Sequence, residues 1–289
     1  MIGKDLIMAT LFGGGSSSSG SGGGGSGGGD EKSLLDALID GSITEISSDT
    51  VESVRTYALF RNAWVTGISL PKATKVGNYG FSECAHLATL NLPCVTEIGD
   101  YGCYSSDKIT ELNLPKLYKA GAYAFGSSSR GGLITVDMPE LVSLSQYAFS
   151  KQHNLVNINL PKLENVPTKA FFSNQGDMIY ETLDFPKVKL ISGGAFQRGV
   201  KFKALVLRSE TPVTLEAATI FNNCSHFNGT VHETYNPEGL RDGYIYVPSA
   251  LVDTYKAATN WSAYAGWFRA LEDYTVDGTI TGELDESKI

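Results

Sequence analysis

The chain has 289 residues, of which 42% are hydrophobic, and this supplies enough apolar material for a continuous core. Its net charge of −8 disfavours nucleic acid and anionic membrane surfaces as partners, because both are bound through clustered lysine and arginine. No stretch approaches the ~18 apolar residues that a membrane-spanning helix requires, so we expect no membrane span.

The N-terminal residues divide into a short peptide and a linker. Residues 1–12 lack the continuous hydrophobic segment and small-residue cleavage site of a secretory leader, so export by the ordinary route is not expected. Residues 13–29 are almost entirely Gly and Ser, a composition that forms a flexible tether because it cannot bury enough surface to offset its ordering entropy. Residues 1–12 are therefore either a frayed terminus or a docking peptide that joins the chain to a larger assembly, such as a virion.

Residues 30–60 are predicted to form an N-terminal cap. A short amphipathic helix is expected over residues 30–39, with an acidic first turn and Gly41 as its stop, and a strand follows over residues 43–46. An array of repeats needs such an atypical end unit to cover its first apolar edge.

Residues 61–243 repeat one pattern of about 22 residues. An apolar residue followed by proline recurs, and ten residues after each proline lies a Phe or, once, a Cys. The prolines are Pro71, Pro93, Pro115, Pro139, Pro161 and Pro186, and the residues ten positions later are Phe81, Cys103, Phe125, Phe149, Phe171 and Phe196. Self-similarity at this period predicts a solenoid.

Each unit contains an alternating strand that ends at its proline. In Thr89–Leu92 the alternation places Leu90 and Leu92 inward and leaves Thr89 and Asn91 outward. A tyrosine column and a phenylalanine column follow at fixed spacing, and we assign both to the core. Burial of each large apolar side chain stabilises the fold by about 1.5–3 kcal/mol, so the stacked columns are the dominant stabilising contribution.

The C-terminal part departs from the repeat. Residues 244–273 are predicted to form a cap with a strand over residues 244–247, a helix over residues 249–258 capped by Ser249, and Trp261, Tyr264, Trp267 and Phe268 sealing the last coil. Residues 274–289 are polar and acidic and are expected to be a loose tail or a contact segment.

Several repeated phrases resemble one known family. Residues 95–102, the Leu-Asn-Leu-Pro strands and Tyr-Ala-Phe at residues 123–125 and 147–149 look like BspA-like (Treponema-type) leucine-rich repeats. The resemblance implies a β-rich solenoid with a parallel sheet on one face, short turns on the other and helical caps. The family is associated with bacterial surface adhesion and protein–protein recognition, and it also occurs in phage-encoded proteins. Cys103 in place of Phe, and Lys169 and Gly194 in place of Tyr, depart from the pattern in single units.

Catalytic and metal chemistry find little support in the sequence. Cys224, His226 and His232 are the only near-neighbour set of metal-ligand types, and a zinc site would need a fourth ligand. No nucleophile elbow occurs. We therefore expect no enzymatic activity, no metal and no cofactor, and we expect the cysteines to be small buried thiols.

Two surfaces are candidates for binding. The first is the outward face of the predicted strands, with Thr89, Asn91, Glu111, Asn113, Thr135, Asp137, Asn157, Asn159 and Asp184. The second is a set of edge loops, with Arg130, Asn174, His232, Tyr235 and Arg241. Short polar side chains on a sheet form either an ordinary solvated surface or a recognition surface for protein or glycan, and both interpretations stay open.

The sequence therefore favours a non-enzymatic recognition or adhesion protein. The first hypothesis is a phage or prophage virion component that is attached to a larger assembly through residues 1–12 and presents its repeats to a host-cell protein or glycan. The alternatives are a bacterial surface adhesin and a structural virion protein without a ligand.

Overall fold

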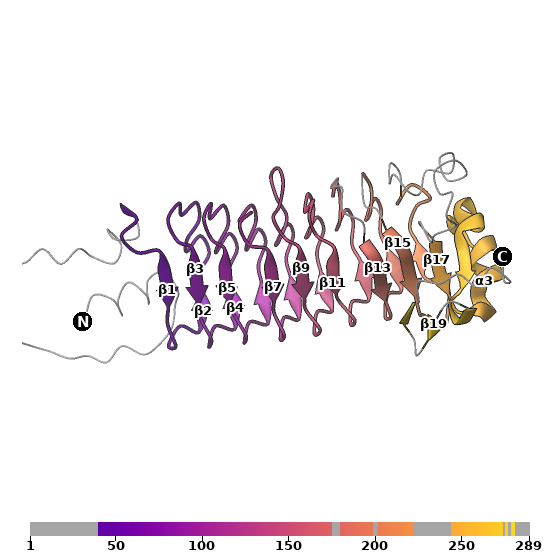
Figure 1. Ribbon diagram of the computed structural model, residues 1–289, viewed down its shortest axis with the longest axis horizontal. Helices are drawn as coiled ribbons and strands as arrows, with labels where there is room; N and C mark the ends of the chain where they lie inside the picture. Colours follow the sequence, from indigo (N-terminus) through magenta and orange to yellow (C-terminus); the bar gives the residue numbers. More distant parts are fainter. Residues whose placement is uncertain are drawn as a thin grey trace, which may run out of the picture.

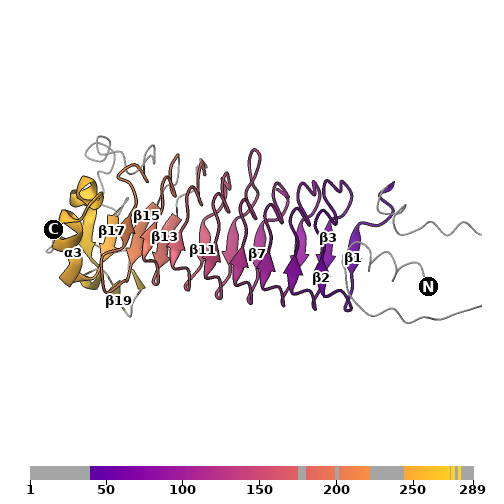
Figure 2. The same cartoon turned by 180° about the vertical axis from the view of Figure 1, so that it is seen from behind.

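A computed structural model of the chain describes residues 40–174, 180–198, 202–221, 244–273, 275–276 and 279–280. These residues form an elongated solenoid whose coils follow one another in sequence order, from β1 at one end to α3 at the other (Figure 1). The view from behind shows the same order of strands (Figure 2). The predicted parallel-strand solenoid is confirmed.

Each of the first eight coils contributes two strands, one to each of two faces, and the ninth contributes a first strand. The first strands are β1 (Glu45–Ser47), β3 (Gly67–Ser69), β5 (Thr89–Asn91), β7 (Glu111–Asn113), β9 (Thr135–Asp137), β11 (Asn157–Asn159), β13 (Tyr180–Phe185), β15 (Phe202–Leu207) and β17 (Tyr244–Val247). The second strands are β2 (Ser53–Val54), β4 (Lys75–Val76), β6 (Glu97–Ile98), β8 (Lys119–Ala120), β10 (Ser143–Leu144), β12 (Asn165–Val166), β14 (Leu190–Ile191) and β16 (Thr214–Leu215).

Paired strands on both faces are parallel and in repeat register. Ile68 lies beside Leu90 on the first face, and Ile98 lies beside Ala120 on the second. Because each step along the solenoid is one repeat, side chains at the same repeat position stack in columns. Proline follows the first strand, where its missing N–H removes no ladder hydrogen bond within the strand.

The inward columns form the core, as predicted. The residues before the prolines, such as Leu92 and Leu114, are fully buried. Phe149 is also fully buried, and its ring stacks on Phe125 at 5.2 Å and on Phe171 at 5.6 Å between centroids. These stacked rings form a continuous apolar column along the solenoid.

The tyrosine column differs from its prediction, because its rings stack but are only partly buried. Tyr101 lies between Tyr79 and Tyr123 at centroid distances of 4.7 and 4.8 Å, with the rings within 8° of parallel. Partial burial and the neighbouring tyrosines raise the pKa of Tyr123 to about 12. The prediction that this column belongs to the core was wrong: it is a stacked ladder along the surface.

The backbone explains why this ladder lies at a turn. Tyr101 has φ +56°, in the left-handed region that non-glycine residues rarely adopt. The same repeat position is left-handed in the other coils, at Tyr57, Tyr79, Tyr123, Tyr147, Lys169 and Gly194. Ring stacking between coils therefore accompanies a conformation that is unfavourable for each tyrosine alone.

The two faces are interrupted at different places. On the first face the hydrogen-bonded strand order stops after β5 and again after β11, whereas on the second it runs unbroken from β2 to β10. The second face is interrupted between β10 and β12, and Pro167 directly follows β12. At the equivalent position Ser145 donates its N–H to Ala120 O at 3.0 Å, and proline has no N–H to donate.

The C-terminal cap contains short helices and one further strand. They are η1 (Ser249–Leu251), α3 (Val252–Ala257), η2 (Trp261–Trp267), β18 (Phe268–Ala270) and η3 (Leu271–Asp273). The Trp261 indole is buried and donates to Val213 O at 2.6 Å, so the predicted aromatic seal is confirmed. The predicted Ser249 cap was wrong: η1 has no side-chain cap, and the Ser249 N–H donates to Glu272 Oε2 at 2.8 Å.

Other predictions fall partly or wholly outside the described residues. These are the peptide 1–12, the linker 13–29, the helix 30–39 and most of the tail, of which the antiparallel pair β19 (Thr275–Val276) and β20 (Thr279–Ile280) is described. Within the described part of the chain, none of the helices has the length and apolar character needed to cross a bilayer.

Two of the three cysteines that the structure describes behave as the small core side chains that were predicted, and the third does not. Cys84 and Cys103 are buried and unpaired, and burial raises the pKa of the Cys84 thiol to about 12 and that of Cys103 above its ordinary value. Cys94 is partly exposed. Protonated buried thiols are poor nucleophiles and poor metal ligands.

Candidate recognition surface

The outward positions of the first strands form one polar face. Thr89, Asn91, Glu111, Asn113, Asn157 and Asn159 are exposed, and Thr135, Asp137 and Asp184 are partly exposed. They share this face because strand side chains alternate and the strands stack in register. The structure therefore brings all nine predicted sheet-face residues to one side of the solenoid.

Hydrogen bonds between coils orient several of these side chains. The Asn91 amide donates to Ser69 Oγ at 2.9 Å, and the Asn159 amide donates to Asp137 Oδ1 at 2.6 Å. Asn157 Nδ2 also lies 3.3 Å from Thr135 Oγ1. Such bonds restrict the rotamers of exposed amides and so lower the entropy that ligand binding would cost.

Asp184 is already engaged by a cation. Arg208 donates to both of its carboxylate oxygens, with the shortest distance 2.7 Å between Arg208 Nη2 and Asp184 Oδ2. This bidentate pair is partly exposed and joins two adjacent coils. Asp184 therefore contributes to coil stacking and presents less free acceptor capacity than the asparagines do.

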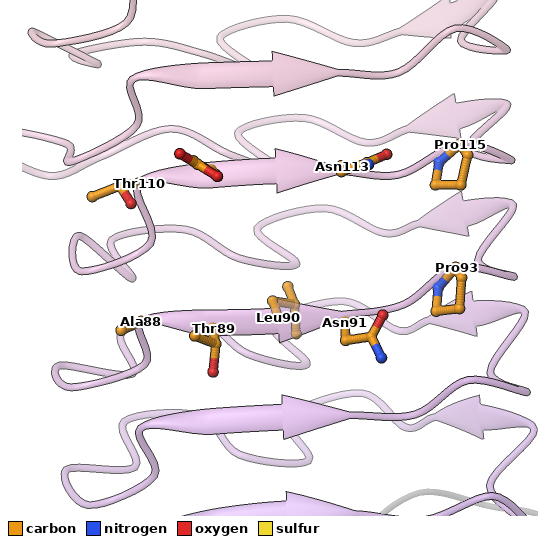
Figure 3. Close-up of a pocket in the computed structure, with 9 residues that line it drawn as sticks. Ala88, Thr89, Leu90, Asn91, Pro93, Thr110, Asn113 and Pro115 are labelled. Carbon is orange, nitrogen blue, oxygen red and sulfur yellow. The ribbon is translucent and has the colours of Figure 1, made fainter.

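A groove of about 410 Å³ opens on this face between β5 and β7. Its lining is Ala88, Thr89, Leu90, Asn91 and Pro93 from one coil and Thr110, Glu111, Asn113 and Pro115 from the next. Figure 3 shows Ala88 and Thr110 at one end and the two prolines at the other, with the asparagines between. Four predicted sheet-face residues, Thr89, Asn91, Glu111 and Asn113, line the groove together.

The groove lies where the first face is interrupted. β5 pairs with β3 and β7 pairs with β9, but β5 and β7 are not hydrogen-bonded to each other. Leu90 is only partly buried, whereas the equivalent Ile68 and Leu112 are buried. The separation of the two strands thus exposes an apolar floor beneath a polar rim.

The edge loop 127–132 is a separate surface. Arg130 is exposed and its Nε donates to His153 Nδ1 at 3.1 Å. Partial burial, followed by the Arg130 charge, lowers the pKa of His153, so its imidazole is neutral near neutral pH. The Lys151 ammonium donates to Ser128 O at 2.6 Å and holds the loop.

The remaining edge-loop residues do not join that surface in the described structure. Asn174 is buried, and its Oδ1 accepts the Gln152 N–H at 3.0 Å, so it supports the fold. His232, Tyr235 and Arg241 lie outside the described residues, as do Cys224 and His226. Among the residues that are described, no three His, Cys, Asp or Glu side chains cluster closely enough to hold a metal ion.

The sequence pattern does not indicate that Ala88, Leu90, Pro93, Thr110 and Pro115 line a site. It predicts Leu90 as a core residue and the prolines as strand ends, whereas the structure leaves Leu90 partly buried against the core and lining the groove. The groove arises because β5 and β7 are not hydrogen-bonded to each other. No single residue of the sequence predicts this.

Two solved structures match part of this chain. They are a leucine-rich repeat protein from Bacteroides ovatus ATCC 8483 (15% identity, TM-score 0.44, 75% of this chain and 65% of that chain covered) and a leucine rich cell surface protein from Faecalibacterium prausnitzii A2-165 (18% identity, TM-score 0.29, 61% of this chain and 62% of that chain covered). The chain thus spans less than two thirds of either protein. None of the curated protein sequences matches it.

The family comparison rests on the repeats themselves. A model of the BspA type leucine rich repeat region matches residues 52–176 in six copies. The matched segment contains the polar face from β3 to β11 and both sides of the groove. Residues 52–176 of this chain are therefore similar to the BspA type leucine rich repeat region.

Proposed function

We propose that this chain is a non-enzymatic recognition protein that binds a protein or glycan on a cell surface through the polar face of β3 to β11. The observation that carries the proposal is the extended row of short, outward polar side chains on a rigid parallel sheet, interrupted by a groove that four of them line. Repeat proteins use such extended surfaces for binding. The BspA-type repeats support adhesion as the class of function.

The composition of the face supports recognition through hydrogen bonds. Asn, Thr and Ser side chains have few rotatable bonds, and coil-to-coil bonds such as that from Asn159 to Asp137 restrict them further. Less conformational entropy is therefore lost on binding than with long charged side chains. Amide and hydroxyl groups also supply both donors and acceptors, which suits peptide groups and sugar hydroxyls.

We further propose that the protein is attached to a larger assembly, a phage or prophage virion, through residues 1–12. The support is the sequence of residues 13–29, whose Gly and Ser composition is that of a flexible tether. A tether lets a rigid solenoid search for a surface ligand while it stays attached. The same domain attached to a bacterial envelope would act as a surface adhesin.

Binding of the labelled full-length protein to intact bacterial cells and to a glycan array tests the recognition role. The triple variant Asn91→Ala, Asn113→Ala and Asn159→Ala should lose binding while its thermal unfolding stays unchanged. A matched control, Lys119→Ala with Asn165→Ala, alters exposed side chains of the opposite face and should bind normally. If the triple variant binds fully, the polar face is not the binding site. If Arg130→Ala abolishes binding instead, the site lies in the edge loops.

Attachment is tested separately. A chain with residues 1–12 scrambled and the linker kept should be absent from purified particles of the producing strain, while its solenoid binds cells as before. Unchanged incorporation would contradict the docking role of this peptide and leave the recognition face unaffected.

A further inference from the structure

The edge loop 127–132 contains a two-residue insertion that presents polar side chains. The next proline follows Phe125 by 14 residues, but it follows Phe149 by 12 residues. Figure 1 shows this loop, directly before β9, rising above the turns of the neighbouring coils. Its exposed residues bring no apolar side chain to the core and are Ser128, Ser129 and Arg130. The insertion therefore extends the surface and not the core.

Hydrogen bonds to the next coil fix the loop. The Gly131 N–H donates to Lys151 O at 2.9 Å, and the Lys151 ammonium donates to Ser128 O at 2.6 Å. The buried Gln152 supports the loop from below, because its Nε2 donates to Phe125 O at 2.6 Å. A Cβ added at Gly131 would collide with the Gln152 side chain, so this close approach requires glycine.

His153 orients the Arg130 guanidinium. Arg130 Nε donates to His153 Nδ1 at 3.1 Å, and the imidazole also forms a hydrogen bond with the backbone of Ser173 in the next coil. A ring that accepts at Nδ1 is neutral and carries its proton on Nε2. Among the described residues, none accepts a hydrogen bond from the two terminal nitrogens of Arg130. Arg130 is therefore held at Nε and leaves the outer side of its planar fork for a ligand.

Arg130 and Lys151 place two positive charges near one ring without a carboxylate between them. Partial burial lowers the pKa of His153 first, and the charges of Arg130 and then Lys151 lower it further. Neither cation forms an ion pair with a residue that the structure describes. Asp107 contacts the loop, but its carboxyl bonds to Ser127. An anion bound between the two cations would offset their mutual repulsion.

We propose that Arg130 and Lys151 form an accessory site for the carboxylate of an acidic sugar. The inference goes beyond the proposed recognition function, because this site is separate from the polar face. The terminal nitrogens of Arg130 donate to both carboxylate oxygens, and the Lys151 ammonium has donors left besides the one used by Ser128 O. His153 is a positioning residue, since it holds the guanidinium and does not touch the ligand.

The groups of the loop favour a sugar carboxylate over other anions. The hydroxyls of Ser128 and Ser129 donate and accept hydrogen bonds, as sugar hydroxyls do, so they suit the ring substituents beside a carboxylate. Protein partners are usually anchored by an apolar or aromatic side chain in a pocket, and these serines form no apolar wall. Phosphates are commonly cradled by backbone N–H groups, whereas those of Ser128, Ser129 and Gly131 are already bonded within the fold.

The experiment is an NMR titration of the full-length, ¹⁵N-labelled protein with trigalacturonate and with its methyl ester. Two exposed cations give a weak site, with a Kd on the order of 1 mM, which this method measures well. Trigalacturonate should shift the amide signals of Ser129 and Arg130. It should also raise the pKa of His153, because neutralising the Arg130 charge removes one cause of its lowering. The ester should cause neither change.

Three variants and a control test the roles of the residues. Arg130→Gln should weaken trigalacturonate binding about threefold to tenfold, which is the range for one exposed bidentate charge pair. His153→Gln keeps an acceptor for Arg130 Nε and should bind as the wild type does, whereas His153→Phe removes it and should weaken binding about threefold. Arg55→Gln removes an exposed arginine of the first coil and should leave the affinity unchanged.

Several outcomes would overturn the inference. Equal binding of the acid and the ester, or full affinity in Arg130→Gln, would refute the carboxylate site, and equal affinity in His153→Phe and His153→Gln would refute the positioning role. Tighter binding of inorganic phosphate or of acetyl-Ser-Glu-Ser-amide than of trigalacturonate would refute the sugar as ligand.

The result is separable from that of the proposed function. The asparagine triple variant should bind trigalacturonate as the wild type does while it loses cell binding, because the loop site alone is weak. Loss of trigalacturonate binding in the triple variant would contradict the separation of the two sites. Absence of trigalacturonate binding by the wild type would refute the loop site and leave the polar face as proposed.

Discussion

Two substitutions of Tyr101, to Ala and to Gly, test the stacked tyrosine ladder. Both the loss in the free energy of unfolding and the order of stability of the two variants are predicted. The Tyr101 ring stacks on Tyr79 and Tyr123, and each aromatic pair contributes about 0.5–1.5 kcal/mol. Loss of the partly buried ring adds about 1 kcal/mol, half of what full burial of a large apolar side chain is worth. Tyr101→Ala should therefore lower the free energy of unfolding by about 2–4 kcal/mol.

Tyr101→Gly removes the same ring but should be less damaging than Tyr101→Ala. At φ +56° an alanine bears a left-handed penalty of about 1–2 kcal/mol that glycine avoids, while glycine loses about 0.5–1 kcal/mol more backbone entropy on folding. The net advantage of glycine is about 0–1.5 kcal/mol. Gly194 occupies the same repeat position at φ +68°, which shows that the fold accepts glycine there.

Urea unfolding of the full-length variants, followed by circular dichroism, measures both differences. The matched control is the pair Asn157→Ala and Asn157→Gly in the middle of the solenoid, where β11 has ordinary strand geometry and glycine should be the less stable by about 0.5–1 kcal/mol. If Tyr101→Ala is more stable than Tyr101→Gly by the margin seen in the Asn157 control pair, the left-handed assignment of this column is incorrect.

Three further predictions concern the core, a buried carboxyl and the second face. Phe149→Ala should cost about 3–5 kcal/mol in urea unfolding because the ring is fully buried between two others, whereas Tyr118→Ala at a 55% exposed position should stay within about 0.5 kcal/mol. Burial raises the pKa of Asp107 above its ordinary value, and its buried Oδ1 has no hydrogen-bond partner among the described residues. The raised pKa means that stability is lost as pH rises past the ordinary carboxyl pKa of 3.8, so Asp107→Asn should raise Tm at pH 7 and not at pH 3; a lower Tm at pH 7 would contradict this. Ser145→Pro should remove the bond to Ala120 O and cost about 1–3 kcal/mol, with exchange of the β10 amides accelerated; an unchanged unfolding midpoint would refute the role given to Pro167.

The fold could be predicted because its signal is redundant. Alternation in Thr89–Leu92 fixes which side chains face inward, and repetition fixes which coil stacks on which, so each column is specified many times over. Single departures such as Cys103 do not alter the column, since its neighbours in the coil remain in register.

The position of the tyrosines could not be predicted by the same reasoning. Periodicity shows that Tyr79, Tyr101 and Tyr123 are stacked, but it does not show whether the stack is inside or along a turn. The deciding quantity is backbone φ, and tyrosine is a poor indicator of a left-handed residue. Gly194 at the equivalent position is the one sequence clue to that conformation.

The groove between β5 and β7 could not be predicted from the sequence. The interval from Pro71 to Pro93 equals that from Pro93 to Pro115, 22 residues each, so the repeat predicts identical pairing on both sides of β5. The structure instead pairs β5 with β3 and not with β7. The candidate residues on either side were therefore predictable as a polar row but not as the lining of one groove.

The opening is confined to one face, and this limits how far the two coils can separate. Across the same two coils the second face stays paired, with Ile98 beside Ala120, and in the turn the Cys103 N–H donates to Ala124 O at 2.8 Å. The coils are therefore held together behind the groove while their first strands are apart. Because of this, β5 and β7 stay within 8 Å of each other. A further strand between them would need a separation of about 9.5 Å, so the opening is a shallow groove in the polar face and not a vacant strand position.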